Sequence, residues 1–215
     1  MTRWIITIYR RHGEAWLNPS FLTSASVAAA LFAVSIIASF YAGIYATERA
    51  SSPVGDLILS NIPVYDVEQF FIWGSLLLIL FIVGLLVIHP NRIPFVLYSL
   101  ALFYFIRSVF VSLTHLGPFP TRIALDSSEI AAKMFGGADL FFSGHTGTPF
   151  LLALMFWHEP RLRYFFLASS VFFAVIVLLG HLHYSIDVLA AFFITYGIYH
   201  MALYFFPKER SLFLS

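Results

Sequence analysis

The sequence predicts an all-α polytopic membrane protein with six transmembrane helices. Hydrophobic residues make up 60% of the 215-residue chain, charged residues make up only 11%, and the mean hydropathy is +0.87. A soluble domain carries about 25% charged residues, and a disordered chain combines high charge with low hydrophobicity. These values argue against a soluble fold and exclude disorder. Six apolar stretches lie at roughly 21–46, 70–88, 94–115, 141–157, 164–180 and 184–206.

Each stretch is a candidate span, because a helix needs about 20 residues to cross a bilayer. Residues 141–157 and 164–180 are the shortest of the six, with 17 residues each. Prolines in the connections 89–94 and 158–163 are expected to end one helix or to begin the next. A short polar stretch, 181–185, separates the last two spans. The longer connections, 47–69 and 116–140, are rich in Pro, Gly, Asp and Ser.

The layout predicts a single membrane domain. We expect residues 1–20 to form an interfacial or cytoplasmic segment, 21–206 a six-helix catalytic domain, and 207–215 a cytoplasmic tail. The first apolar stretch is too long for the hydrophobic region of a cleaved signal peptide, so we interpret it as a retained signal anchor. Residues 1–16 are expected to be either an interfacial helix or a disordered tail.

The basic residues predict the orientation. Eight of the twelve Lys and Arg residues lie in the two termini and the two short connections, and three lie in the long connections. Both termini should therefore be cytoplasmic, and the long connections and residues 181–187 should face the periplasm, exterior or lumen. The formal net charge of +1 provides no field for nucleic acid. The absence of Cys excludes disulfides and thiolate zinc sites.

Residues 139–146, Asp-Leu-Phe-Phe-Ser-Gly-His-Thr, form the first candidate element for chemistry. Ser143 is suited to cap the fourth span, and Gly144 would let the backbone approach a ligand closely. The free N–H groups at a helix N-terminus favour an anion such as phosphate, with His145 beside it. The structural alternative is a capped helix in which His145 only bonds to a neighbour.

Residues 181–187, His-Leu-His-Tyr-Ser-Ile-Asp, form the second element. His183 and Asp187 are four residues apart, so we expect them on one helical face. A carboxylate on one imidazole nitrogen leaves the other nitrogen basic, which suits a nucleophile or a general base. The structural alternative is a buried His–Asp pair that fixes the last helix. His181 should lie on another face and is assigned a structural role, which also argues against a three-histidine zinc site with His145.

The spacing of the two elements makes contact between them geometrically possible. His145 and His183 are 38 positions apart, enough for one span inward, a short turn and one span back. Both histidines then return to the same outer layer. One could attack phosphorus while the other protonates the leaving oxygen.

These residues resemble a known family. The patterns Asp139-x-x-Phe-Ser-Gly-His145-Thr and His183-Tyr-Ser-x-Asp187-Val are similar to the two C-terminal motifs of the sphingomyelin synthases, within the type 2 phosphatidic acid phosphatase superfamily. Weaker similarities are Pro63 with Asp66, and Tyr104-x-x-Arg107. Two features differ: Gly137-Ala138 replaces the family's Cys-Gly, and the Lys-x6-Arg-Pro motif of ordinary superfamily phosphatases is missing. The differences put the substrate in question more than the chemistry.

The resemblance implies a catalytic triad of His145, His183 and Asp187, with no metal and no cofactor. His183 would attack the lipid phosphodiester to give a phosphohistidine, Asp187 would orient it, and His145 would protonate the leaving alkoxide and then activate the acceptor. The implied substrate- or phosphate-binding residues are Ser143, Gly144, Arg107, Asp139, Tyr184 and Asp66. Arg107 has an equal structural alternative as the partner of a loop carboxylate, and for Asp66 we favour loop capping.

The leading hypothesis is a head-group phosphotransferase that takes a glycerophospholipid as donor and ceramide or a diacylglycerol-like lipid as acceptor. The alternative is a lipid phosphatase or phospholipase C-type hydrolase that uses the same residues with water. A non-enzymatic lipid-binding or transport protein is the third reading. The expected partners are membrane lipids and not nucleic acid, and a homo-oligomer is compatible with the sequence.

Overall fold

The computed structural model describes residues 3–123 and 140–214. Throughout these residues the regular structure is helical and no strand occurs, which confirms the predicted all-α class for this part of the chain. The helices are α1 (Arg3–Trp16), α2 (Pro19–Glu48), α3 (Glu68–Ile88), the short 3-10 helix η1 (Pro90–Arg92), α4 (Ile93–Leu113), α6 (Gly144–Met155), α7 (Pro160–Leu179), α8 (Ser185–Phe205) and α9 (Pro207–Leu214).

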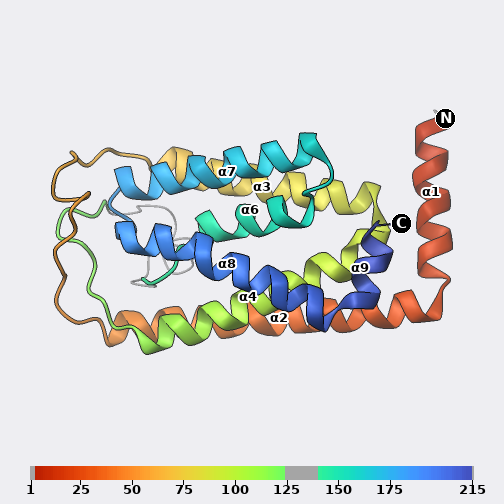
Figure 1. Cartoon of the computed structure of the whole chain (residues 1–215), viewed down its shortest axis with the longest axis horizontal. Coiled ribbons are helices and arrows are strands. Elements are labelled where there is room, and N and C mark those ends of the chain that lie inside the picture. Colours follow the sequence, from red (N-terminus) through yellow and green to blue (C-terminus); the bar gives the residue numbers. More distant parts are fainter. Residues whose placement is uncertain (1–2, 124–139, 215) are drawn as a thin grey trace.

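The long helices form an elongated bundle (Figure 1). α2, α3, α4, α7 and α8 run along the long axis, α6 lies between them, and α1 crosses one end. Both chain ends lie at that end, here called the terminal end. The connection between α2 and α3 and the one after α4 lie at the opposite end, here called the loop end.

Five of the described helices are long and apolar enough to cross a membrane, namely Pro19–Glu48, Glu68–Ile88, Pro90–Leu113, Pro160–Leu179 and Ser185–Phe205. The predicted fourth span, 141–157, is different, because α6 has only 12 residues and is about 18 Å long. Its N-terminus lies part-way along the bundle (Figure 1). An integral membrane protein is supported, while six spans and cytoplasmic termini stay predictions.

Prolines begin α2, η1 and α7, and the last two of these starts were predicted. Pro19 follows the capping residue Asn18, whose side chain accepts a hydrogen bond from the backbone N–H of Ser20. Pro90 begins η1, and Pro160 begins α7. Proline suits these first positions because they have no helical partner for an N–H. The prolines of the two short connections therefore predicted the starts of η1 and α7 correctly.

The core of the bundle is built around α6. Leu151, Leu152 and Ala153 are fully buried, and α6 packs against α4, α7 and α8. A Cβ at Gly147 would come within 2.8 Å of the Phe103 ring and of Thr195 Oγ1, so only glycine fits where α6 meets α4 and α8. By contrast, α3 is apolar and has only two buried residues, Phe71 and Ser75, as expected of a helix that faces lipid on one side.

Residues 3–16 form a helix and not a disordered tail. α1 is connected to α2 through the turn at Leu17 and Asn18 and contacts η1. His12 lies 2.7 Å from the carbonyl oxygen of Val87, and Trp16 donates to His12. α1 therefore lies against the end of the bundle, and its position in the membrane interface stays a prediction.

Candidate active site

Ser143 caps α6 as its sequence position predicts. Its backbone is extended (φ −62°, ψ 116°), and its side-chain oxygen accepts a 3.4 Å hydrogen bond from the backbone N–H of Thr146. The two residues before it, Phe141 and Phe142, have positive φ values of 87° and 50°. Side chains with a Cβ rarely adopt this left-handed backbone, and such strain concentrates at functional sites. The turn that presents Gly144 and His145 is thus held in an unfavourable backbone conformation.

His183 and Asp187 are in contact, and both are buried. His183 Nδ1 lies 3.2 Å from Asp187 Oδ2, which also accepts a 3.0 Å hydrogen bond from the backbone N–H of Tyr184. With the ring proton on Nδ1 donated to the carboxylate, the lone pair of Nε2 is left for chemistry. The orientation of this histidine is therefore set by Asp187.

The geometry behind this contact differs from the predicted helical face. α8 begins only at Ser185, so His183 precedes the helix, and Asp187 folds back onto the capping residue Tyr184 in a capping box. His181 and His183 likewise lie in the turn before α8 and not on a helix. Two residues four positions apart, one before the helix start and one in the first turn, thus come into contact much as an i, i+4 pair inside a helix does.

The two sequence elements meet in space. The backbone N–H of Ser143 donates a 3.1 Å hydrogen bond to the carbonyl oxygen of Asp187. The cap of α6 is thereby fixed to the first turn of α8, although the two residues are distant in sequence. This backbone contact is the most direct evidence that both elements belong to one site.

His145 lies among aromatic rings. Its ring centroid is 4.2 Å from that of Phe71 on α3 and 5.8 Å from that of Phe173 on α7. The imidazole is only partly buried. Packing of this kind limits the rotation of a side chain that would have to transfer a proton.

Arg107 extends from α4 to the start of α6. Its Nε donates a 3.2 Å hydrogen bond to the carbonyl oxygen of Phe142, and its Nη1 lies 3.4 Å from Ser39 Oγ. A Cβ at Gly144 would lie 3.1 Å from Arg107 Nε. A buried guanidinium thus lies directly against the backbone that begins α6, where it adds positive charge to the helix N-terminus.

Asp56 is a residue of the site region that sequence reasoning missed. Its Oδ2 accepts hydrogen bonds of 2.7 Å from the backbone N–H and 2.8 Å from the hydroxyl of Ser185, and its Oδ1 accepts from the N–H groups of Ile58 and Leu59. Burial alone would raise the pKa of this carboxyl, but the bonds from Leu59, Ser185 and Ile58 outweigh burial and lower it. Asp56 joins the α2–α3 connection to the start of α8. A contact across 129 positions leaves no local signal in the sequence.

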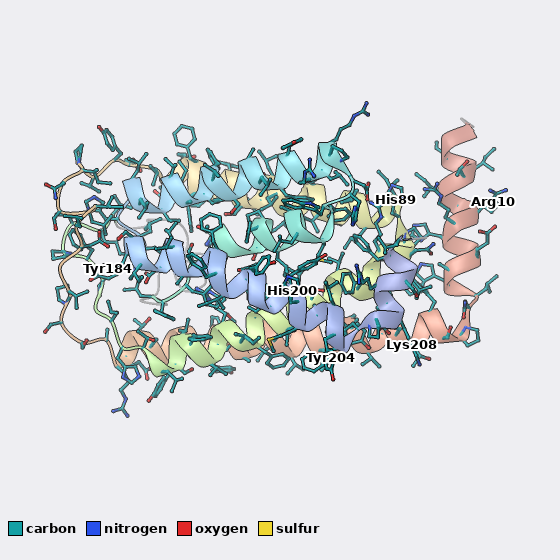
Figure 2. All side chains as sticks on the ribbon, in the orientation of Figure 1. Arg10, His89, Tyr184, His200, Tyr204 and Lys208 are labelled. Atoms are coloured by element: carbon teal, nitrogen blue, oxygen red, sulfur yellow. The ribbon has the colours of Figure 1, made fainter. Side chains whose placement is uncertain are left out.

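The hydroxyl of Tyr184 makes its hydrogen bonds with the backbone of the connections at the loop end. Its hydroxyl donates to the carbonyl oxygen of Gly117 at 2.8 Å and accepts from the N–H of Val54 at 3.2 Å. Burial raises the pKa of this phenol, and the charges of Asp187 and Asp56 raise it further, against the hydrogen bond from Val54. Tyr184 lies at the loop end in Figure 2, and these contacts favour a structural role over the predicted contact with substrate.

The remaining predicted residues lie apart from this centre or outside the described residues. Asp66 is exposed and accepts a hydrogen bond from the N–H of Glu68 at the start of α3, as the capping alternative expects. Asp139 lies outside the described residues. His181 is buried, has a φ of 51°, and places Nδ1 2.6 Å from Thr121 Oγ1. These contacts fit the structural role assigned to His181.

The C-terminal part of the chain is similar to a known family. Residues 136–204 match the family model described as PAP2 superfamily C-terminal. The matched segment, about a third of the chain, contains Ser143, His145, His183 and Asp187. No curated protein and no solved structure matches the chain. The match supports a place in the type 2 phosphatidic acid phosphatase superfamily, whose members are lipid phosphatases and phosphotransferases.

Proposed function

We propose that this protein is a sphingomyelin synthase-like phosphotransferase that moves the phosphorylated head group of a glycerophospholipid to a lipid alcohol such as ceramide or a diacylglycerol-like acceptor. The observation that carries the proposal is the contact between the two sequence elements, residues 139–146 and 181–187. His183 is oriented by Asp187 at 3.2 Å, and Asp187 is bonded through its backbone to the cap of α6 at 3.1 Å. The family match over the same residues supports the general class of chemistry.

In the first step, His183 Nε2 attacks the phosphorus of the donor lipid. A nitrogen–phosphorus bond forms, and the bond from phosphorus to the glyceride oxygen breaks. His145 gives its proton to that oxygen, so a neutral diacylglycerol leaves. The Nδ1 proton stays on His183 and is held by Asp187, which stabilises the positive charge on the phosphorylated imidazole.

In the second step, the roles reverse. His145 is now neutral and accepts the proton of the acceptor hydroxyl, while the acceptor oxygen attacks phosphorus. The nitrogen–phosphorus bond breaks, and both histidines return to their starting states. The phosphorus is thus displaced twice, and no metal or cofactor enters either step.

The phosphate charge is balanced by Arg107 and by the first turn of α6. Charge stabilisation where the phosphoryl oxygens lie is the main contribution that a protein makes to this reaction. Arg107 already touches the Phe142 carbonyl and the backbone at Gly144. Asp139, in our proposal, receives the cationic part of the head group.

Water in place of the acceptor alcohol would make the same site a phosphatase or a phospholipase C-type hydrolase. The two reactions share every residue above and differ only in the second step. The missing Lys-x6-Arg-Pro motif bears on the substrate more than on the chemistry, so turnover of labelled lipids has to distinguish the two reactions. The proposed membrane orientation, with the loop end facing the periplasm, exterior or lumen, applies to both.

The test is turnover of labelled phosphatidylcholine, phosphatidylethanolamine and phosphatidic acid by the purified protein in detergent, with and without ceramide. His183→Ala and His145→Ala are the site variants. His200→Ala is the matched control, because His200 is an exposed histidine further along α8 (Figure 2).

A phosphosphingolipid made by the wild type and by His200→Ala, but by neither site variant, supports the transferase. Release of diacylglycerol or phosphate at the same rate without ceramide indicates the hydrolase instead. A folded protein that is silent with every lipid contradicts both enzymes and leaves the lipid-binding or transport alternative.

A further inference from the structure

A pocket opens at the terminal end, away from the candidate active site. It encloses about 240 Å³, and its polar lining comes from Arg11 on α1 and from His89, Asn91 and Arg92 around η1. Phe213 near the end of α9 adds an apolar wall. Three segments that are far apart in the sequence thus build one concave surface.

The pocket is rich in positive charge and in hydrogen-bond donors. Arg11 Nη1 lies 3.3 Å from His89 Nδ1. Burial lowers the pKa of His89, and the charges of Arg92 and Arg11 lower it further against the opposite effect of Glu159. The imidazole is then neutral, and if Nδ1 accepts from Arg11, Nε2 carries a hydrogen for a ligand.

The guanidinium of Arg92 is fixed by its contacts, but one of its nitrogens makes no hydrogen bond within the described part of the chain. Its Nη2 pairs with Glu159 at 2.8 Å, and its guanidinium lies over the rings of Phe156 and Phe213 at 5.2 and 5.5 Å. Its Nη1 is buried and has no hydrogen-bond partner among the described residues. A buried, unpaired donor of a charged group is costly, and an anionic oxygen would satisfy it.

The position of the pocket points to a lipid. α1 crosses the end of the bundle (Figure 1), and its sequence combines cationic residues with apolar and aromatic ones. A helix that lies across the ends of membrane spans is at the depth of the phospholipid phosphates. Two guanidinium groups against one carboxylate leave the pocket positive, which favours a lipid with net negative charge over a zwitterionic one.

We propose that this pocket binds the phosphate of an anionic phospholipid from the leaflet at the terminal end. Arg11, Arg92 Nη1 and His89 Nε2 donate hydrogen bonds to the phosphate oxygens, and Phe213 lies beside the glycerol. The lipid would join α1, η1 and α9. This site is separate from the proposed catalytic chemistry, so failure of one proposal leaves the other intact.

The experiment is native mass spectrometry of the full chain in detergent with added phosphatidylglycerol or phosphatidylcholine, in the wild type and in Arg11→Gln. Arg10→Gln is the matched control, because Arg10 is the neighbouring residue, pairs with Glu14 and lies on the side of α1 away from the bundle (Figure 2). Loss of one charge-assisted contact should weaken phosphatidylglycerol retention about tenfold in Arg11→Gln. Arg10→Gln should bind as the wild type does.

His89→Phe provides a second variant, since it removes a donor but keeps an aromatic ring, and it should weaken phosphatidylglycerol retention as well. Arg92→Gln also removes the pairing with Glu159, so the test does not depend on it. Equal retention of phosphatidylcholine and phosphatidylglycerol would overturn the proposal, as would equal binding by Arg11→Gln and Arg10→Gln. Displacement of the lipid by an equal concentration of inorganic phosphate would assign the pocket to free phosphate.

Discussion

Asp187 accepts hydrogen bonds through both its carboxylate and its backbone carbonyl. Its Oδ2 accepts from His183 and from the backbone of Tyr184, while its Oδ1 is buried and has no hydrogen-bond partner among the described residues. The backbone of the same residue holds Ser143. Burying a carboxylate with few hydrogen-bond partners costs free energy. The proposed mechanism uses this charge to orient His183.

Asp187→Asn should separate charge from shape. The amide is the same size, and its oxygen can still accept from His183 Nδ1 and from the Tyr184 N–H at the Oδ2 position, but it carries no negative charge to stabilise a positively charged imidazole. We expect turnover of the labelled lipid to fall by about 10²–10⁴-fold with the helical circular dichroism preserved. Turnover within twofold of the wild type would show that Asp187 is structural only.

Gly144→Ala tests the close approach of Arg107 to the backbone. The added Cβ would lie 3.1 Å from Arg107 Nε, so the guanidinium or the first turn of α6 must move. We expect turnover to fall about tenfold, in the range of a lost charge-assisted hydrogen bond. The control is Gly197→Ala on α8, where a Cβ meets nothing within 4 Å, and which should retain full turnover.

At the scale of elements, the start of α8 depends on a carboxylate from another connection. Asp56 accepts two hydrogen bonds from Ser185 and two from its own loop. Because its pKa is lowered in the folded state, its contribution to stability is present above the unfolded value of 3.8 and is lost as pH falls through the folded pKa.

Asp56→Asn should lower the stability by about 1–3 kcal/mol at pH 7, because the amide nitrogen faces donors of Ser185 or of the loop. Thermal unfolding in detergent at pH 7 and pH 3.5 measures this. The variant should lose less stability on acidification than the wild type does. Asp66→Asn, which alters a single exposed cap bond at α3, is the comparison and should shift the midpoint less.

How far the sequence could predict these elements depends on the range of the contacts. The proline starts of η1 and α7 and the Ser143 cap are local, and they were predicted correctly. The contact of His183 with Asp187 was expected across a helical face and arises instead in the capping turn before α8. The left-handed backbone at Phe141 and Phe142, just before α6, could not be anticipated, because two phenylalanines carry no sequence signal for it.

At the scale of the whole molecule, the two ends of the bundle are chemically different. The loop end holds Asp56, Tyr184 and the start of α8, and the terminal end holds Arg11 and Arg92 (Figures 1 and 2). Both chain ends lie together, which is what an even number of passes produces. The charge distribution predicts that the terminal end is cytoplasmic.

This orientation is testable with single cysteines, because the chain has none of its own. Leu57→Cys lies at the loop end and Leu17→Cys at the terminal end, and both leucines are 84% exposed. A membrane-impermeant thiol reagent applied to intact cells should label the first variant and spare the second. After permeabilisation both should react, and the opposite pattern in intact cells would invert the proposed topology.

The position of Phe71 has a consequence for the membrane around the protein. This ring packs at a tilted angle against His145, with the ring centroids 4.2 Å apart, and belongs to α3, which has few buried residues and is expected to face lipid. With 21 residues, α3 matches a hydrocarbon layer of about 30 Å. A thinner bilayer would tilt α3 and shift the ring against which the proposed acid–base histidine rests. If the proposed mechanism holds, bilayer thickness would alter the catalytic geometry, and lipids that are not substrates would change the rate.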